Sequence, residues 1–234
     1  MGATTTQAQP ISELDRIIDQ VTLFDGMSTG ERAMLQSIME PRTIGKYTYI
    51  YHQDDQAEYV YLLAEGTVKI GTQHNDGREM IKRILHPEAV FGEIGLFSND
   101  RHNSFAMTLN TEVRVYRVSV SSFRQLMRQS AQLNFNVLEM IGRRLTNTEK
   151  RLESLIFKDA RARIIDFLRF NAETRGRKVG FETFFKHNLT QQDIANFTGT
   201  SRQTVTSVLN ELRKSNLIYF NRTGILIRDL ANLE

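Results

Sequence analysis

The stretch from Leu189 to Asn216 constrains the fold more than any other part of the chain, because it has the pattern of two short helices joined by a tight turn. Thr190 is a helix N-cap residue with Asp193 three positions later, and Gly199 ends the helix that they begin. Ser201 can cap a second helix directly afterwards. One face of that second helix is apolar and carries Val205, Val208, Leu209 and Leu212. A helix pair that crosses over so short a turn is typical of a helix-turn-helix.

The opposite face of the second helix is polar, and it is left projecting when the apolar face packs inward. Arg202 can pair bidentately with guanine, Gln203 can do so with adenine, and Ser207 can bond a phosphate or a base edge. We therefore predict a recognition helix that enters the major groove of DNA. The predicted DNA contacts are Thr190, Gln191, Ser201, Arg202, Gln203, Thr204, Thr206, Ser207 and Arg222. The alternative is an ordinary helical hairpin whose Arg and Gln side chains are solvated.

Two short apolar runs, Leu217–Phe220 and Ile225–Ile227, follow the helix pair and flank Asn221–Gly224. They predict a β-hairpin wing with Arg222 at its basic tip. Residues 141–234 contain 17 Lys and Arg against 10 Asp and Glu, a net charge of +7, whereas residues 1–140 contain 13 against 17, a net charge of −4. The basic excess thus lies in the part that carries the predicted helix-turn-helix, as contact with phosphates requires.

The length and composition limit the class of protein. With 234 residues, 40% of them hydrophobic, the chain can bury one large core or two ordinary ones, and we expect two. It contains no cysteine, which excludes disulfides and cysteine-ligated iron–sulfur or zinc sites. No apolar run reaches the roughly 18 residues needed to span a membrane, and no signal-peptide pattern is present. We expect a cytoplasmic protein without a membrane partner, with a disordered polar tail over residues 1–10.

The middle of the chain has a β pattern. Short helices are expected around residues 11–21 and 28–39, with Pro41 stopping the second. The strand-like runs that follow, separated by turn residues, are 47–51, 59–63, 67–70, 80–85, 106–109 and 112–118. Asp76-Gly77 is a strong hairpin signal. So many short strands predict a compact antiparallel β-roll, jelly-roll-like, within a domain spanning residues 11–132.

A long helix is expected over residues 133–158. Its apolar positions alternate three and four apart, as in the seam of a coiled coil: Leu138, Ile141, Leu145, Thr148, Leu152 and Leu155. We predict that this seam is the interface of a homodimer, and the alternative is that it packs on the chain's own β-roll. Lys158-Asp159 marks a break, after which a helix over 160–172 and a strand over 179–185 lead into a C-terminal domain of residues 159–234. The predicted fold class is α+β.

The order of these parts resembles that of the Crp/Fnr transcription regulators over roughly residues 20–228. The matching segments are Tyr51-His52-Gln53, Glu65-Gly66-Thr67-Val68, Asp76-Gly77-Arg78-Glu79-Met80, Gly92-Glu93-Ile94-Gly95-Leu96-Phe97, Arg143-Arg144-Leu145 and Thr200-Ser201-Arg202-Gln203-Thr204-Val205. The resemblance implies a cyclic-nucleotide-binding-type β-roll, a central dimerisation helix and a C-terminal winged helix-turn-helix. It also implies binding to a palindromic site in double-stranded DNA and contact with RNA polymerase.

The resemblance also implies an effector pocket, and here the sequence departs from the cAMP-responsive members. The pocket positions are Gly92, Glu93, Asn103, Ser104, Thr148 and Glu149. Asn103 stands where the family's phosphate-binding arginine is expected, and an amide cannot supply the charge or the two-pronged geometry that a phosphodiester needs. Glu149 stands where a serine is expected. We therefore predict a small-molecule effector other than cAMP, or none, with Gly92 and Glu93 equally compatible with a purely structural turn.

Other cofactors and functions follow from the same residues. Haem stays an alternative because five histidines are available, although they have no ligand spacing: His52, His74, His86, His102 and His187. A second reading is a cyclic-nucleotide sensor whose basic C-terminal part docks a protein or a membrane. We predict no enzymatic activity, because no catalytic triad, metal cluster or phosphate-binding loop is found. In the recognition helix, Gln203 and Ser207 replace the glutamate and second arginine of the family, which predicts a shifted half-site.

Overall fold

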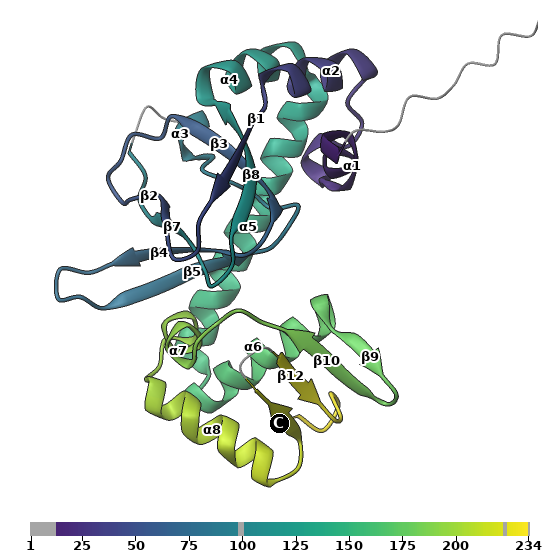
Figure 1. Ribbon diagram of the computed structural model, residues 1–234. Helices are drawn as coiled ribbons and strands as arrows, with labels where there is room; N and C mark the ends of the chain where they lie inside the picture. Colours follow the sequence, from purple (N-terminus) through teal and green to yellow (C-terminus); the bar gives the residue numbers. More distant parts are fainter. Residues whose placement is uncertain (1–12, 98–100, 222–223, 234) are drawn as a thin grey trace, which may run out of the picture.

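The computed structural model describes residues 13–97, 101–221 and 224–233, which form a β-roll domain, a long helix and a smaller C-terminal domain (Figure 1). The fold class predicted from the sequence is confirmed. The disordered tail predicted over residues 1–10 lies outside the described residues.

The β-roll consists of two four-stranded antiparallel sheets. One has the strand order β1-β8-β3-β6, and the other has the order β2-β7-β4-β5. The strands are β1 (Glu40–Ile44), β2 (Tyr49–Tyr51), β3 (Tyr59–Glu65), β4 (Val68–Gln73), β5 (Glu79–Leu85), β6 (Val90–Phe91), β7 (Phe105–Thr108) and β8 (Val113–Ser119). The turn between β4 and β5 contains Asp76-Gly77, as predicted, and Gly77 has a positive φ of 87° that suits glycine.

Helices cover one end of the roll. These are α1 (Glu13–Gln20), a 3₁₀ turn (Thr22–Phe24), α2 (Thr29–Ile38), the short α3 (Ile94–Phe97) and α4 (Val120–Gln129). Helix α2 ends before Pro41, as predicted, and Pro41 itself lies within β1. In the sheet order β1 lies at the edge, with β8 as its one neighbour among the described strands, and proline is tolerated in an edge strand.

Helix α5 (Ala131–Phe157) runs from the roll to the C-terminal domain. Its 27 residues give a length of about 40 Å. It ends at Phe157 with Lys158 as its C-cap, and Asp159 caps α6 (Ala160–Arg175) by accepting a 2.7 Å hydrogen bond from the Ala162 amide. The break predicted at Lys158-Asp159 is therefore present.

The C-terminal domain places α6, α7 (Gln191–Thr198) and α8 (Arg202–Lys214) on a four-stranded sheet of order β11-β12-β10-β9. Its strands are β9 (Arg177–Val179), β10 (Glu182–Lys186), β11 (Ile218–Phe220) and β12 (Gly224–Ile227). The single strand predicted over residues 179–185 is wrong, because Gly180 at φ 62° turns the chain into a β9–β10 hairpin. The predicted wing is present as the β11–β12 hairpin.

The buried residues form three clusters, two in the roll and its helices and one in the C-terminal domain. The last cluster extends beyond the domain, since Leu109 of the roll is buried in it and Ile84 of β5 packs against it. The two domains therefore share an apolar contact. Within the described residues, no helix combines the length and the apolar character that crossing a bilayer requires.

Candidate nucleic-acid interface and effector pocket

The first helix of the predicted helix-turn-helix, α7, begins with a capping box. The Thr190 hydroxyl accepts from the Asp193 amide at 3.1 Å, and the Asp193 carboxylate accepts from the Thr190 amide at 2.9 Å. These two bonds satisfy backbone donors that a helix start leaves free. The helix ends at Gly199, whose φ of 66° is left-handed and favours glycine. The local sequence therefore determines both ends of α7.

The turn between α7 and α8 is held by α6. Arg163 donates to the carbonyl of Thr198 at 2.8 Å and to that of Gly199 at 3.0 Å. A cation at the C-terminal end of a helix is favoured by the helix dipole. Ser201 then starts α8 by accepting from the Thr204 amide at 3.0 Å. This arrangement fixes the angle between the two helices.

Helix α8 buries its apolar face and exposes its polar face, as predicted. Val205, Val208, Leu209 and Leu212 are buried in the core of the C-terminal domain. Arg202, Gln203 and Ser207 are exposed, and among the described residues none of their side chains has a hydrogen-bond or ion-pair partner. An unpaired guanidinium, amide and hydroxyl on one exposed helix face are free to contact base edges and phosphates.

The remaining predicted DNA contacts have different surroundings. The Thr206 hydroxyl donates to the Gln191 side chain at 2.6 Å, so these two residues join α8 to α7. Thr190, Ser201 and Thr204 act in the helix caps, and Arg222 lies outside the described residues. The exposed face that remains free is therefore narrower than the set predicted from the sequence.

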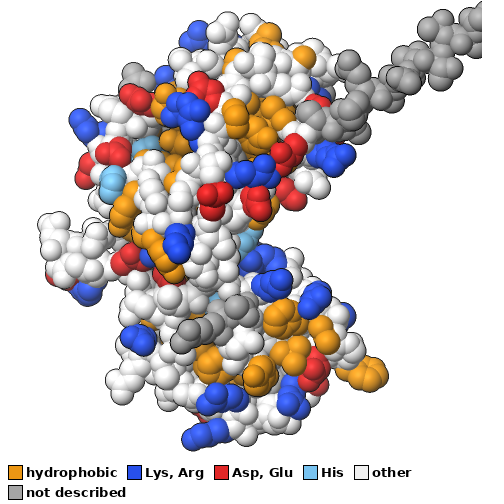
Figure 2. Space-filling view, viewed as in Figure 1, with side chains coloured by type: hydrophobic (Ala, Val, Ile, Leu, Met, Phe, Trp, Pro, Cys, Tyr) orange, Lys and Arg blue, Asp and Glu red, His pale blue; other side chains and the backbone are white. Residues whose placement is uncertain are grey.

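On the face shown in Figure 2, basic side chains predominate over acidic ones on the C-terminal domain, whereas the roll carries both signs. This distribution agrees with the charge split along the sequence and provides a favourable field for phosphates.

The predicted effector pocket lies between the roll and α5, and its charged centre consists of three residues. The Glu93 carboxylate forms an ion pair with Arg144 of α5 and lies 3.7 Å from Arg83 of β5. Burial, and then repulsion from Arg83, lowers the pKa of Arg144 to about 9, so this guanidinium is still charged at neutral pH. Two half-buried guanidinium groups thus face one carboxylate. The other carboxylate oxygen of Glu93, Oε2, is buried and has no hydrogen-bond partner among the described residues.

Gly92 has a backbone role that is independent of any ligand. Its φ is 79°, and a Cβ there would lie 2.7 Å from the Tyr59 carbonyl oxygen. Any other residue would therefore force the strand apart. The backbone conformation alone therefore accounts for Gly92. The carboxylate of Glu93, in contrast, faces Arg83 and Arg144.

The position expected to bind a phosphate is occupied by a closed local network. The Ser104 hydroxyl donates to the Asn103 side-chain oxygen at 2.9 Å, and Lys82 donates to the Asn103 carbonyl at 3.0 Å. No guanidinium comes from residue 103, in agreement with the sequence. The other two predicted pocket residues, Thr148 and Glu149, are exposed on α5, and the Thr148 hydroxyl bonds its own helix at the Arg144 carbonyl.

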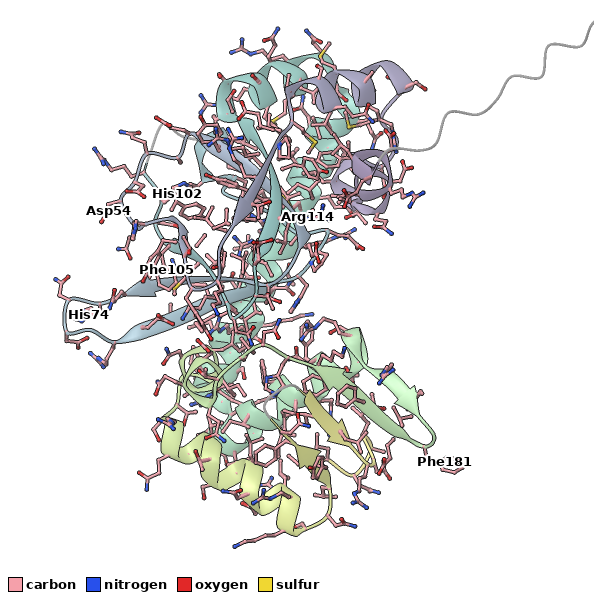
Figure 3. All side chains as sticks on the ribbon, viewed as in Figure 1. Asp54, His74, His102, Phe105, Arg114 and Phe181 are labelled. Atoms are coloured by element: carbon pink, nitrogen blue, oxygen red, sulfur yellow. The ribbon has the colours of Figure 1, made fainter. Side chains whose placement is uncertain are left out.

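Ring side chains stack on one another within the roll, and Figure 3 labels two of its ring-bearing residues, His102 and Phe105. The His102 ring stacks on Tyr51 with centroids 3.6 Å apart, and Tyr61 stacks on Phe91 at 5.0 Å. Burial raises the pKa of the Tyr51 hydroxyl and lowers the pKa of His102, so both rings are neutral at pH 7. Within the described part of the chain, no three His, Asp or Glu side chains converge as metal ligands.

The apolar side chains of the predicted dimer seam are largely exposed along α5. Leu138, Leu145 and Leu152 are 68%, 60% and 59% exposed, and Leu155 is 43% exposed. Ile141 is half-buried. The alternative that this face packs on the chain's own roll is therefore wrong for the four leucines.

Several residues of these sites could not be found from the sequence. Arg83 is not marked by any motif, and its place opposite Glu93 depends on the β4–β5 register. Arg144 was visible only as part of a family segment. Lys69 and Arg151, which join the two domains, lie far in sequence from the groups that they bind.

Two family models match the chain. The model described as the cyclic nucleotide-binding domain matches residues 41–130, and that described as the Crp-like helix-turn-helix domain matches residues 162–234. The first range includes Arg83 and Glu93 of the pocket, and the second includes the exposed face of α8, whereas Arg144 lies between the two ranges.

Curated relatives cover nearly the whole chain. A CRP-like cAMP-activated global transcriptional regulator of Mycobacterium tuberculosis is 29% identical over 94% of this chain and 98% of its own length. The cAMP-activated global transcriptional regulator CRP of Haemophilus influenzae is 26% identical over 92% of this chain and 97% of its own. The relatives are named as regulators of transcription, which agrees with the prediction that the chain is not an enzyme.

Solved structures share the fold. FixK2 from Bradyrhizobium japonicum superposes with a TM-score of 0.75 and 25% identity, covering 84% of this chain and 96% of that one. The c-di-GMP responsive global regulator CLP of Xanthomonas campestris gives a TM-score of 0.71 at 22% identity, over 86% and 99% of the two chains.

Proposed function

This chain belongs to the Crp/Fnr family of transcription regulators, and on that premise we propose that it binds a palindromic DNA site as a homodimer and contacts RNA polymerase there. The observation that carries the proposal is the free polar face of α8, where Arg202, Gln203 and Ser207 are exposed without partners in the described chain. A bare leucine seam on α5 supports the dimer, since burying each leucine contributes about 1.5–3 kcal/mol. A DNA-binding regulator acts where the chromosome is, and the cytoplasmic location stays a prediction.

The geometry of a dimer agrees with a two-part site. Two copies related by a twofold axis along α5 present one α8 helix each, and half-sites one helical turn apart require the two reading helices to be about 34 Å apart. Selection from a library of randomised duplexes tests this proposal. We expect a palindromic consensus with two half-sites, and enrichment of no sequence over random DNA would contradict it.

The effector is proposed to be a small molecule other than cAMP. Support comes from Asn103, whose side chain is engaged by Ser104 and supplies no positive charge. Further support comes from Arg83 and Arg144, which face the single carboxylate of Glu93 and leave one positive charge for an anionic group of a ligand. Activation by cAMP is a property of the relatives that carry it in their names. The pocket of this chain differs from theirs at the phosphate position.

Calorimetric titration of the full-length protein tests the effector proposal. We expect no saturable heat with cAMP for the wild type. Asn103→Arg restores a guanidinium at the phosphate position, so we expect measurable cAMP binding by this variant. Saturable cAMP binding by the wild type that Asn103→Arg leaves unchanged would contradict the proposal.

The second candidate, a sensor whose basic part docks a protein or a membrane, is weaker. The exposed groups on α8 suit base edges, and nothing on that face is apolar enough for a protein or lipid contact of comparable specificity. Random-sequence and selected duplexes bound with equal affinity would favour it.

A further inference from the structure

The helix-turn-helix is attached to the β-roll of the same chain by a buried ion pair. Lys69 of β4 is 8% exposed, and its ammonium lies 2.9 Å from the Glu79 carboxylate and 3.2 Å from that of Asp193. Burial lowers the pKa of Lys69, but the hydrogen bond to Glu79 and the charge of Asp193 outweigh it, so the pKa is raised and the group is charged. Asn196 of α7 donates to the same Glu79 carboxylate at 3.2 Å.

Asp193 has two functions at once. One of its oxygens closes the capping box at the start of α7, through the bonds to Thr190, and the other binds Lys69. The start of the first helix of the helix-turn-helix is thereby fixed to the β4–β5 hairpin. A buried carboxylate that loses Lys69 would be left uncompensated, which is strongly unfavourable.

The other end of α7 is attached to the dimer helix. Arg151 of α5 donates to the carbonyls of Ile81 and Lys82 in β5 at 2.6 Å each, and to the carbonyl of Phe197 in α7 at 2.5 Å. Its guanidinium also lies 4.5 Å from the centre of the Phe197 ring. One side chain thus joins α5, β5 and α7.

These contacts position α8 without covering the exposed polar face that is proposed to contact DNA. Helix α7 is joined to α8 by the Gln191–Thr206 hydrogen bond, and both helices bury apolar residues, Ala195 and Val205 among them, in one core. Arg202 and Gln203 stay exposed. A rigid attachment of α7 to β4–β5 and α5 therefore fixes the direction of α8 relative to the dimer helix.

We propose that Lys69 and Arg151 are positioning residues that set the separation of the two reading helices in the dimer. The inference rests on the proposed function. Without either residue, the C-terminal domain turns more freely about the break at Lys158-Asp159. Each α8 then still binds a half-site, but the distance between the two α8 helices of the dimer is no longer fixed at the value that one half-site spacing requires.

The test is the dependence of DNA affinity on spacer length. The selected palindrome is made with its spacer shortened by one base pair, unchanged, and lengthened by one, together with a lone half-site. One base pair shifts a half-site by about 3.4 Å and rotates it by about 35°, so we expect the wild type to prefer its own spacing by about tenfold. Lys69→Met and Arg151→Met should each reduce that preference at least about threefold, with half-site affinity unchanged.

Two matched variants separate positioning from mere stability. Arg78 lies at the tip of the same hairpin and pairs only with Asp76 in the described chain, so Arg78→Met should keep the full preference. Lys69→Arg keeps the positive charge and should therefore keep most of the spacer preference. A spacer preference that Lys69→Met and Arg151→Met leave at the wild-type value would overturn the proposal.

A measurement without DNA keeps the proposal testable if the selection yields no site. The chain contains no cysteine, so spin labels can be placed at Gln129→Cys on α4 and Glu173→Cys on α6, both exposed. Labelled chains are diluted with unlabelled chains so that distances within one chain dominate. Lys69→Met should broaden the distance distribution, and Arg151→Lys, which is milder, should broaden it less. An unchanged width in both variants would refute positioning, whereas equal binding of selected and random DNA would refute the proposed function alone.

Discussion

At the scale of single residues, Arg202 is the side chain from which the largest loss of specificity is expected. It lies in the first turn of α8, exposed and without a partner in the described chain. A bidentate pair with guanine is worth about 1–3 kcal/mol of discrimination, so Arg202→Ala should lose that much on the selected site and relax the preference at one position. Fluorescence anisotropy with selected and random duplexes measures both the loss of affinity and the loss of specificity.

Arg213→Ala is the matched control for this prediction. Arg213 lies at the far end of α8, donates to Asn210 at 3.0 Å and sits over the Phe220 ring. Any loss that it causes should be the same on selected and random duplexes. Equal losses on both duplexes for Arg202→Ala would argue that Arg202 contacts phosphate alone.

Gln203 is predicted to determine one base of the half-site. Its exposed amide can donate to and accept from adenine, whereas a glutamate at that position accepts from cytosine. Gln203→Glu should therefore shift the selected base at one position per half-site, with a discrimination of about 1–3 kcal/mol. Randomised-site selection with both proteins provides the measurement, and identical consensus sequences would refute the assignment.

The residue-level features that could be predicted are local ones. Thr190, Asp193, Ser201 and Gly199 act within a few positions of themselves, so the caps of α7 and α8 follow from spacing alone. The Gln191–Thr206 bond could not be predicted in the same way, because it depends on how two helices cross. Two predicted DNA contacts therefore turned out to bond each other.

At the scale of elements, the exposed seam of α5 makes the strongest prediction. Leu145 is 60% exposed near the middle of the helix, and a dimer buries it against its twofold mate. Leu145→Glu places two like charges in that apolar interface, so we expect a monomer in sedimentation velocity at micromolar concentration, with at least a hundredfold weaker association, or about 3 kcal/mol.

Lys150→Glu is the matched control, because it introduces the same residue at an exposed position away from the seam. It should leave the dimer intact. A wild-type protein that sediments as a monomer would contradict the proposed assembly directly.

Elements with a strong period could be predicted, and short or irregular ones could not. The long apolar alternation of α5 predicted its extent to within two residues at its start. Strand β1 was missed because Glu40–Ile44 contains a proline and no alternating pattern, and β6 has only two residues. The β9–β10 hairpin was missed because Gly180 lies inside a run that otherwise suits a single strand.

At the scale of the whole molecule, the two domains meet at a contact that could not be predicted from sequence because its residues are distant along the chain. Besides Lys69 and Arg151, it includes His86 after β5, whose Nδ1 lies 3.0 Å from the Arg175 guanidinium of α6. Burial, and then the charge of Arg175, lowers the pKa of His86 to about 4. The neutral imidazole accepts the hydrogen bond from Arg175, and protonation would place two cations together.

Acidification should therefore weaken the folded protein through His86. In the unfolded chain the imidazole takes up a proton as the pH falls below about 6.5, whereas in the folded protein it stays neutral down to about 4. The unfolded state thus binds more protons in this window, and the free energy of unfolding rises with pH across it. Urea unfolding should show a His86-dependent loss of about 2 kcal/mol between about pH 7.5 and pH 5.

The variant His86→Gln retains an acceptor for Arg175 and does not titrate, so it isolates this contribution. The pKa of His187 is also lowered, first by burial, and contributes with the same sign in both proteins, so the difference between wild type and His86→Gln cancels it. As the pH falls from about 7.5 to about 5, the free energy of unfolding should therefore decrease more for the wild type than for His86→Gln. Parallel curves for wild type and His86→Gln would mean that the imidazole takes up its proton at the same pH in the folded and unfolded protein, and would contradict the contact with Arg175.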